Sequence, residues 1–255
     1  MLLVIDIGNT NTVLGIFDSE KLIESWRLSS STMRTVDESW VMIKLLCNTA
    51  NLKAESINGV AISSVVPCFT TLYVQMARKF LSLEPVVVDS KVNLGLKILC
   101  KNPAEVGADR LCNAVAGKAL YPLPQIIIDL GTATTFDVLT EQGDYLGGAI
   151  APGLDTASDN LIKRAAKLQK IDLEFPKKVI GTTTKESLQS GIMIGHKEMI
   201  SGMVRNIKTE LQNSNIYVVL TGGFSEPIKK HSPDIDAVNP LLTLEGLRLI
   251  SSMNA

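Results

Sequence analysis

One short pattern occurs twice in this chain, and the repeat limits the folds that the chain can adopt. The first copy is DIGNTNT (Asp6 to Thr12) and the second is DLGTATTFD (Asp129 to Asp137), 123 positions further on. Each copy follows an apolar run and leads into a second apolar stretch, which is typical of two strands joined by a tight turn. Two such units, each opening one half of the chain, indicate an internal duplication. We expect the two turns to face one another across a cleft.

The composition is that of a globular protein and excludes several classes of function. Hydrophobic residues make up 45% and charged residues 20% of 255 residues, which suffices for a large core. A net charge of −1 without a Lys/Arg block argues against nucleic-acid binding. No apolar run reaches the roughly 18–20 residues of a membrane span, and the run before Asp6 is too short for a signal peptide. Scattered thiols and only two histidines predict no zinc site and a reducing, cytoplasmic location (Cys47, Cys68, Cys100 and Cys112).

Strand-like and helix-like stretches alternate along the chain, which predicts an α/β fold. In the first half we expect strands at residues 2–6, 12–18, 21–29, 57–66 and 84–89, and helices at 37–51, 69–81 and 103–120. Pro103 would stand in the first turn of the last helix, where its missing N–H is harmless. In the second half we expect strands at 125–131, 134–140, 145–152 and 216–224. Helices should begin near 154, run from about 185 to 212, and follow Pro240.

The residues of the two turns suit a phosphate group and its cation. Glycine lets backbone N–H groups approach a phosphate, and the short Asn and Thr side chains add donors without bulk. A carboxylate beside a phosphate is repelled unless a cation lies between them, so Asp6 and Asp129 imply a metal. Mg²⁺ accompanies nucleoside triphosphates and needs few carboxylates. The alternative reading is a tight turn whose Asn and Thr residues only satisfy the backbone.

Further motifs carry a resemblance to a known family. The paired turns and the TGG at residues 221–223 resemble the actin, sugar kinase and Hsp70 ATPase superfamily. Within it, the chain resembles type III pantothenate kinases in motifs that lie in order over nearly its whole length: ISSVVP at 62–67, GLKI at 95–98, NPAEVGADR at 102–110, GGAIAPGL at 147–154, SLQSGI at 187–192 and LTLEGL at 242–247. The resemblance implies the actin-like ATPase superfamily fold: two ribonuclease H-like domains, at residues 1–118 and 119–255, with a cleft between them.

The resemblance also implies a reaction and its participants. The reaction is transfer of the ATP γ-phosphate, with Mg²⁺, to the primary hydroxyl of pantothenate, the opening step of coenzyme A synthesis. Asp129 matches a carboxylate that holds a monovalent cation, K⁺ or NH₄⁺. Thr184, seven residues before Gly191, matches a threonine that reaches pantothenate across the interface of a homodimer. ATP-binding positions match Asp6, Ile7, Gly8, Asn9, Thr10, Asn11, Thr12, Val13 and Thr132.

The acceptor site is implied by the GADR motif. Gly107, Ala108, Asp109 and Arg110 match the pantothenate-binding element, and Asp109 stands where the family has its proton acceptor. Physical chemistry supports that role, because phosphoryl transfer needs mainly positioning and one group that accepts the hydroxyl proton. Asp109 should lie at the start of a helix, where backbone N–H groups and Arg110 keep it ionised. The alternative is that Asp109 only caps the helix.

One position departs from the family, and other readings stay open. The family often has tyrosine seven residues before the glycine of GADR, where this chain has Cys100, so pantothenate contacts there are in question. A member that has become a regulatory or accessory protein is one alternative. Another is a small-molecule kinase acting on a sugar or an acetate-like acid. Asp137 could be a solvated strand-edge residue or a cation ligand. Intact Asp109 and Asp129 favour an active kinase.

Overall fold

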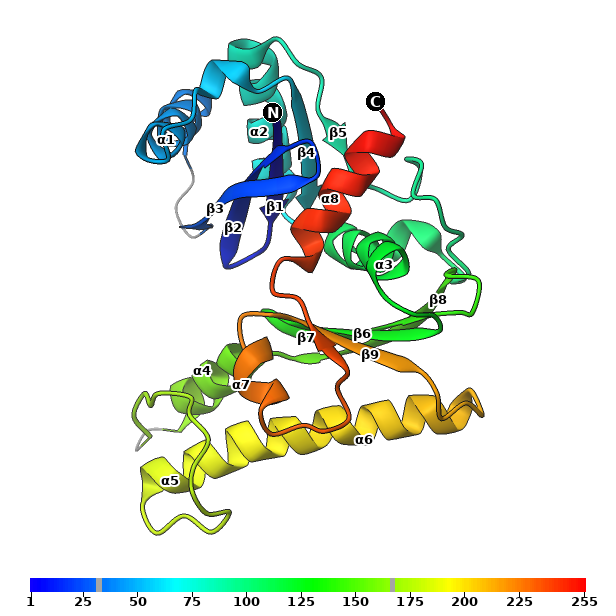
Figure 1. Ribbon diagram of the computed structural model, residues 1–255. Coiled ribbons are helices and arrows are strands. Elements are labelled where there is room, and N and C mark those ends of the chain that lie inside the picture. The colour runs from blue at the N-terminus through cyan, green and yellow to red at the C-terminus, as the bar shows by residue number, and fades with distance from the viewer. Residues whose placement is uncertain (31–33, 166–167) are drawn as a thin grey trace. The chain divides into compact units, whose positions relative to one another are not determined.

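The structure is a computed structural model that describes residues 1–30, 34–165 and 168–255. The chain forms two compact units (Figure 1). The first unit comprises Met1–Leu120 together with Leu242–Ala255, and the second comprises Tyr121–Leu241. This division differs from the predicted ranges of 1–118 and 119–255 in one respect that matters: the last segment packs with the first unit.

The first unit is built on a five-stranded mixed sheet in the order β3-β2-β1-β4-β5. The central strand β1 pairs antiparallel with β2 and parallel with β4, and β4 continues parallel with β5. The strands are β1 (Leu2–Ile7), β2 (Asn11–Asp18), β3 (Lys21–Ser29), β4 (Gly59–Ser64) and β5 (Val86–Val87). The predicted strands are all present, although β5 is far shorter than predicted.

Helices cover both faces of this sheet. Helices α1 (Val36–Thr49) and α2 (Pro67–Met76) pack against one face and bury a cluster that includes Leu3, Ile5 and Ile62. Helices α3 (Ala108–Leu120) and α8 (Leu242–Met253) pack against the opposite face, around Val4 and Ala61 (Figure 1). The alternation of these strand residues between the two clusters follows from the two-residue period of a strand.

The helix predicted from residue 103 begins later than expected. A single 3₁₀ turn spans Pro103–Glu105, Val106 is extended, and α3 begins at Ala108. Proline at the first position suits either kind of helical start, because its fixed φ is compatible with both. The sequence pattern therefore located a helix correctly but merged it with the turn that precedes it.

The second unit repeats the strand order of the first. Its sheet runs β10-β9-β6-β7-β8, in which β6 pairs antiparallel with β7 and parallel with β9. The strands are β6 (Gln125–Leu130), β7 (Ala133–Leu139), β8 (Tyr145–Pro152), β9 (Tyr217–Gly222) and β10 (Ala237–Val238). Thus β6 and β9 take the places that β1 and β4 hold in the first unit. The shared order agrees with the duplication inferred from the sequence.

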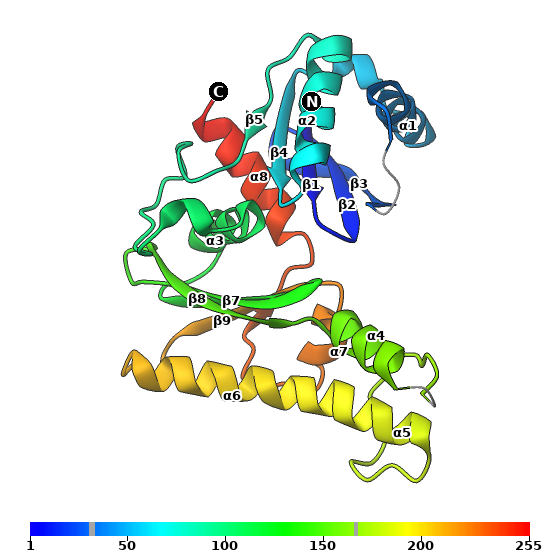
Figure 2. The ribbon, with the colours of Figure 1, turned by 180° about the vertical axis from the view of Figure 1, so that it is seen from behind.

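A long helix packs beneath this second sheet (Figure 2). Helix α5 (Thr184–Gln189) passes through a π-helical turn (Ser190–Ile194) into α6 (Gly195–Glu210). Met193, Ile200 and Val204 of this segment contact the apolar face of the sheet. Helix α4 (Leu154–Arg164) was predicted, whereas the short α7 (Ser225–Lys229) and β10 were not. Within the described residues, no helix is both long and apolar enough to cross a membrane.

Candidate functional site

The first glycine turn is a tight connection between β1 and β2. The Gly8 N–H donates to the carbonyl of Asn11 at 2.9 Å. A Cβ at Gly8 would lie 3.1 Å from that same oxygen, which is closer than most side chains tolerate. Asn9 and Thr10 are exposed at the tip. The turn therefore presents short polar side chains and approachable backbone, as the sequence indicated.

Not every residue of the predicted ATP loop can use its side chain. Ile7 and Thr12 are almost fully buried, with 1% and 2% of their surfaces exposed. The Thr12 hydroxyl is hydrogen-bonded to that of Ser30 at 2.9 Å, and the Ser30 N–H donates to the Thr10 carbonyl at 2.9 Å. Ile7 and Thr12 can thus offer a ligand only their backbone. Ser30 anchors the loop, a role that the sequence did not reveal.

Asp6 lies at the end of β1, half-buried, beside the neighbouring strand β4. In the parallel pairing of β1 and β4, Asp6 stands opposite Ser63. The Ser63 hydroxyl donates to Asp6 Oδ1 at 2.9 Å. The carboxylate is therefore held by a side chain from the adjacent strand.

Asp109 occupies the first turn of α3, as predicted. Its Oδ1 accepts from the Arg110 N–H at 2.8 Å, and the Leu111 N–H donates to the Gly107 carbonyl at 3.1 Å. A Cβ at Gly107 would lie only 2.5 Å from Asp109 Oδ1. Glycine at 107 thus leaves room for the carboxylate in this orientation, and the helix start carries a negative charge that its backbone N–H groups stabilise.

The buried thiol of Cys112 is affected by the charges of two candidate-site carboxylates, Asp6 and Asp109. Cys112 lies one turn beyond Asp109 on α3 and is fully buried. Its pKa is raised well above the usual range of thiols, first by burial and then by the negative charges of Asp6 and Asp109. The structure therefore brings Asp6 and Asp109, which are far apart in sequence, into one electrostatic environment.

The second glycine turn joins β6 to β7 and is braced from outside the turn. Thr132 is exposed, and its carbonyl accepts from the Gly153 N–H at 3.1 Å and from the Thr156 hydroxyl at 2.6 Å. A Cβ at Gly153 would lie 2.1 Å from the Gly131 carbonyl oxygen. The start of α4 therefore packs directly against the backbone of this turn.

Asp129 and Asp137, the two carboxylates of this region, have different surroundings. Asp129 is half-buried at the end of β6, where Thr135 and Thr221 are its register neighbours. Asp137 is fully buried and accepts from the Tyr145 hydroxyl at 2.6 Å and from the Thr135 hydroxyl at 3.2 Å. A solvated strand-edge role for Asp137 is therefore wrong.

A histidine to which the sequence gave no role supports this second turn. His196 on α6 is hydrogen-bonded through Nε2 to the Thr134 hydroxyl at 2.9 Å. Burial lowers the pKa of His196 below its usual value, because the charged form is poorly solvated there. His196 is thus a neutral structural partner of β7 near neutral pH.

Two predicted residues remain, Cys100 in the first unit and Thr184 in the second. Cys100 is half-buried in the irregular segment before the 3₁₀ turn. Thr184 is exposed at the first position of α5, directly after Thr183, whose side chain caps the helix by accepting from the Glu186 N–H at 3.2 Å. Thr184 is therefore on a well-ordered helix start with its side chain open to the surface.

The acidic residues fit a nucleotide-bound cation better than a protein-only metal centre. Across the three described stretches of chain, no group of three or more His, Cys, Asp or Glu side chains could hold a metal ion. Mg²⁺ that arrives with phosphates needs only one or two carboxylates, because phosphate oxygens and water complete its shell. Asp6, half-buried beside a glycine turn, fits that requirement.

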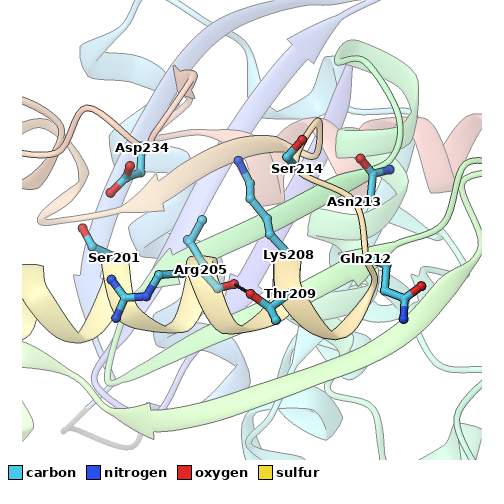
Figure 3. Close-up of a pocket in the computed structure, with 9 residues that line it drawn as sticks. Ser201, Arg205, Lys208, Thr209, Gln212, Asn213, Ser214 and Asp234 are labelled. Carbon is cyan, nitrogen blue, oxygen red and sulfur yellow. Dashed lines mark hydrogen bonds between the residues drawn. The ribbon is translucent and has the colours of Figure 1, made fainter.

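A separate cavity of about 590 Å³ lies on the second unit (Figure 3). It is lined by α6 and the segments that follow: Ser201, Val204, Arg205, Lys208, Thr209, Gln212, Asn213, Ser214 and Asp234. Among its lining residues, none belongs to the two glycine turns or to the start of α3. The cavity is therefore distinct from the candidate site.

Comparisons with known proteins agree with these features. A family model described as type III pantothenate kinase matches residues 2–206. A protein of that name from Thermomicrobium roseum is 44% identical over 97% of this chain and 95% of its own length. Another, from Halalkalibacterium halodurans, is 42% identical over the full length of both chains.

Solved structures with low identity support the fold. A candidate Baf family transcriptional activator from Campylobacter jejuni matches 99% of this chain and 98% of its own, with a TM-score of 0.64 and 16% identity. A ROK hexokinase from Thermus thermophilus matches 98% of each chain, with a TM-score of 0.52 and 12% identity. With the repeated mixed sheets, they confirm the predicted actin-like ATPase superfamily fold. From the family match and the identity over full length, the chain belongs to the type III pantothenate kinase family.

Proposed function

We propose that this chain phosphorylates pantothenate with ATP, producing 4′-phosphopantothenate in the first step of coenzyme A biosynthesis. The observation that carries the proposal is the joint placement of Asp6 and Asp109 around Cys112. One carboxylate ends a strand beside a glycine turn suited to phosphate, and the other opens the helix that carries the GADR motif. Family membership supplies the identity of the acceptor.

Each residue has a defined task in the proposed reaction. Asp109 accepts the proton of the pantothenate hydroxyl as its oxygen attacks the γ-phosphorus, and the bond to the bridging oxygen breaks to leave ADP. Gly107 and Ala108 admit the acceptor, and Arg110 binds its carboxylate. The turn from Asp6 to Val13 and Thr132 hold the phosphates through backbone and short side chains. Bound Mg²⁺ neutralises the charge of the phosphates.

The test of this function is ADP release that depends on pantothenate. Purified protein should produce ADP with ATP, Mg²⁺ and pantothenate, and a sugar or acetate should not replace pantothenate. The assay should be run in Na⁺, K⁺ and NH₄⁺ salts. If pantothenate produces no ADP in any of them, the accessory-protein reading replaces this proposal.

We also propose that Asp129 holds a monovalent cation, K⁺ or NH₄⁺. Its carboxylate is half-buried at a strand end next to a turn that would carry phosphate, where an uncompensated negative charge is unfavourable. Thr135 and Thr221, its register neighbours on β7 and β9, carry hydroxyl oxygens, which are suitable ligands for a weakly hydrated cation.

Asp129→Asn is expected to abolish most of the stimulation by K⁺ or NH₄⁺ and to lower the stimulated rate about 10- to 100-fold, the usual effect of disturbing a metal site. The measurement is the rate as a function of salt at constant ionic strength. Asp234→Asn, which removes an exposed carboxylate of the same unit, is the matched control and should respond like the parent. If K⁺ or NH₄⁺ still stimulates the rate of Asp129→Asn as in the parent, the cation binds at another site.

A homodimer with a shared pantothenate site is the third part of the proposal. Thr184 is exposed on a capped helix start, and the preceding Val179 and Ile180 expose 69% and 83% of their surfaces. Gly191 is in the π-helical turn that follows α5, and a Cβ there would meet no atom within 4 Å, so another helix could approach closely. An exposed apolar segment next to a predicted substrate residue is what a partner chain would cover.

Mixing two defective variants should test whether sites are shared. Thr184→Ala alone should raise KM for pantothenate about 2- to 10-fold, the effect of one hydrogen bond. Thr184→Arg should block the site, and Asp109→Asn should remove the proton acceptor. After subunit exchange, each heterodimer holds one intact and one doubly defective site, so roughly a quarter of parental activity should return. Exchange that restores no activity would exclude a site built from two chains.

The cysteines are consistent with a cytoplasmic enzyme, which we include in the proposal. All four are free thiols, two of them buried in the first unit (Cys47 and Cys112). Free thiols persist in reducing compartments, whereas oxidising ones favour disulfides.

A further inference from the structure

We propose that Ser63 is a positioning residue that orients Asp6 toward nucleotide-bound Mg²⁺. The inference deepens the proposed function and rests on it, because it concerns how the same site binds its nucleotide. The sequence motifs gave Ser63 no role, and it comes from a segment distant from Asp6 in sequence, β4.

The hydroxyl of Ser63 is placed for Asp6 by strand register. Ser63 is fully buried, and it is the residue of β4 that stands directly opposite Asp6 of β1. Its Oγ donates to Asp6 Oδ1 at 2.9 Å. A buried hydroxyl group almost always has a hydrogen-bond partner, and the charged carboxylate of Asp6 is a strong acceptor for that of Ser63. The bond fixes one oxygen of Asp6 and thereby limits rotation of the carboxylate.

The second unit has a hydroxyl residue at the equivalent position. Strands β6 and β9 correspond to β1 and β4, and in their pairing Asp129 stands opposite Thr221. Thr221 is also nearly fully buried, with 2% of its surface exposed. Both strand-end carboxylates thus have a small buried hydroxyl residue beside them. Because the arrangement occurs in both sheets, we infer that the hydroxyl residues serve the carboxylates and are not there by chance.

Helix α3, which carries Asp109, is held by a contact with α8. A Cβ at Gly246 of α8 would lie 2.0 Å from the Cys112 carbonyl oxygen, so the two helices are in backbone contact at this point. Helix α3 therefore cannot shift without moving α8. Asp109 is on the same turn of α3 as Cys112, so this contact also fixes the start of the helix that carries the proposed proton acceptor.

The experiment compares ADP binding with and without Mg²⁺ by calorimetry. Ser63→Ala removes one oxygen atom and should weaken Mg·ADP binding about 10-fold, a typical loss when a metal ligand loses its orienting partner. Binding of metal-free ADP should stay within twofold of the parent. Ser64→Ala is the matched control, since Ser64 is the next residue of β4 and its hydroxyl donates to the Val66 carbonyl at 3.2 Å. It should leave both affinities unchanged.

Two results with Ser63→Ala would overturn the proposal. Unchanged Mg·ADP affinity would mean that Asp6 needs no orienting partner. An equal loss of Mg·ADP and metal-free ADP binding would mean that Ser63 supports the fold of the turn and not the metal. In an Asp6→Asn background, Ser63→Ala should add no further loss of Mg·ADP affinity, and an additive loss would also contradict the proposal.

These binding measurements use no pantothenate, so they remain decisive for Ser63 even if the parent protein shows no turnover with pantothenate.

Discussion

Asp109→Asn is expected to lower kcat about 10²- to 10⁴-fold, the usual contribution of a positioned acid–base group. Asparagine has the same shape as aspartate but cannot accept the proton of the acceptor hydroxyl. The carboxylate accepts from the Arg110 N–H through Oδ1, and an amide oxygen can keep that bond. The variant should therefore fold normally, and its KM for pantothenate should change far less than kcat. Steady-state kinetics with both substrates measures the two parameters separately.

Two controls define that result. Mg·ADP affinity should remain close to the parent value, since Asp109 is assigned to the acceptor side. Asp18→Asn, which changes an exposed carboxylate at the end of β2, should leave kcat unchanged. If Asp109→Asn retains kcat within a few-fold, Asp109 is only a helix-capping residue.

Gly153→Ala should have a large effect on folding stability, although Gly153 is not a predicted ligand. The added Cβ would lie 2.1 Å from the Gly131 carbonyl oxygen and 2.7 Å from that of Thr132. These atoms are backbone, so they cannot rotate away, and either the turn or the start of α4 must move. Overpacking of this kind costs about 1–3 kcal/mol of folding free energy. Because the displaced segment is the second glycine turn, ATP affinity should fall as well.

Gly202→Ala is the matched control for this change. Gly202 is in the middle of α6, and the nearest atom to an added Cβ is the Arg205 guanidinium Nη2 at 3.9 Å. Alanine is the better helix former by about 1 kcal/mol, so this variant should be as stable as the parent or more so. Urea unfolding and nucleotide titration compare the two variants. If Gly153→Ala and Gly202→Ala have the same stability and the same nucleotide affinity, the contact between α4 and the turn contributes to neither.

The sequence predicted the central strands well because their signals are local. The runs before Asp6 and Asp129 are apolar, and each glycine turn is followed by a second apolar stretch, so both hairpins could be located from neighbouring residues. Short elements were harder to predict. Helix α7 contains Pro227 at its centre, and β10 has only two residues, so neither shows a full period of its pattern.

The placement of α8 depends on contacts distant in sequence and could not be predicted. Its helical pattern was clear after Pro240, but the pattern does not state which sheet the apolar face meets. Leu244, Leu247 and Ile250 pack in the first unit with residues of β1 and α3. The backbone contact between Gly246 and Cys112 holds α8 against α3 of the first unit, and it joins residues 134 positions apart in sequence.

The candidate site likewise has some features that local sequence signals located and others that depend on distant contacts. The glycine turns and the Asp109 helix start are continuous motifs, so the sequence located them, and their functional roles stay predictions. Ser30, Ser63 and His196 were missed because each reaches the site from another element through one side chain. For Ser63 a signal existed: a polar pair interrupts the otherwise apolar strand ISSVV directly where β4 passes β1. Strand register was needed to interpret it.

The return of α8 to the first unit has a consequence for the order in which the protein is made. Tyr121–Leu241 is continuous, so the second unit can be completed as soon as that stretch has left the ribosome. The first unit cannot, because the face of its sheet that α3 and α8 share stays partly uncovered until Leu242–Met253 has been synthesised. Domains generally fold as units during translation. The unit that begins the chain is therefore the last to be finished, and its apolar face needs protection while the other half is being made.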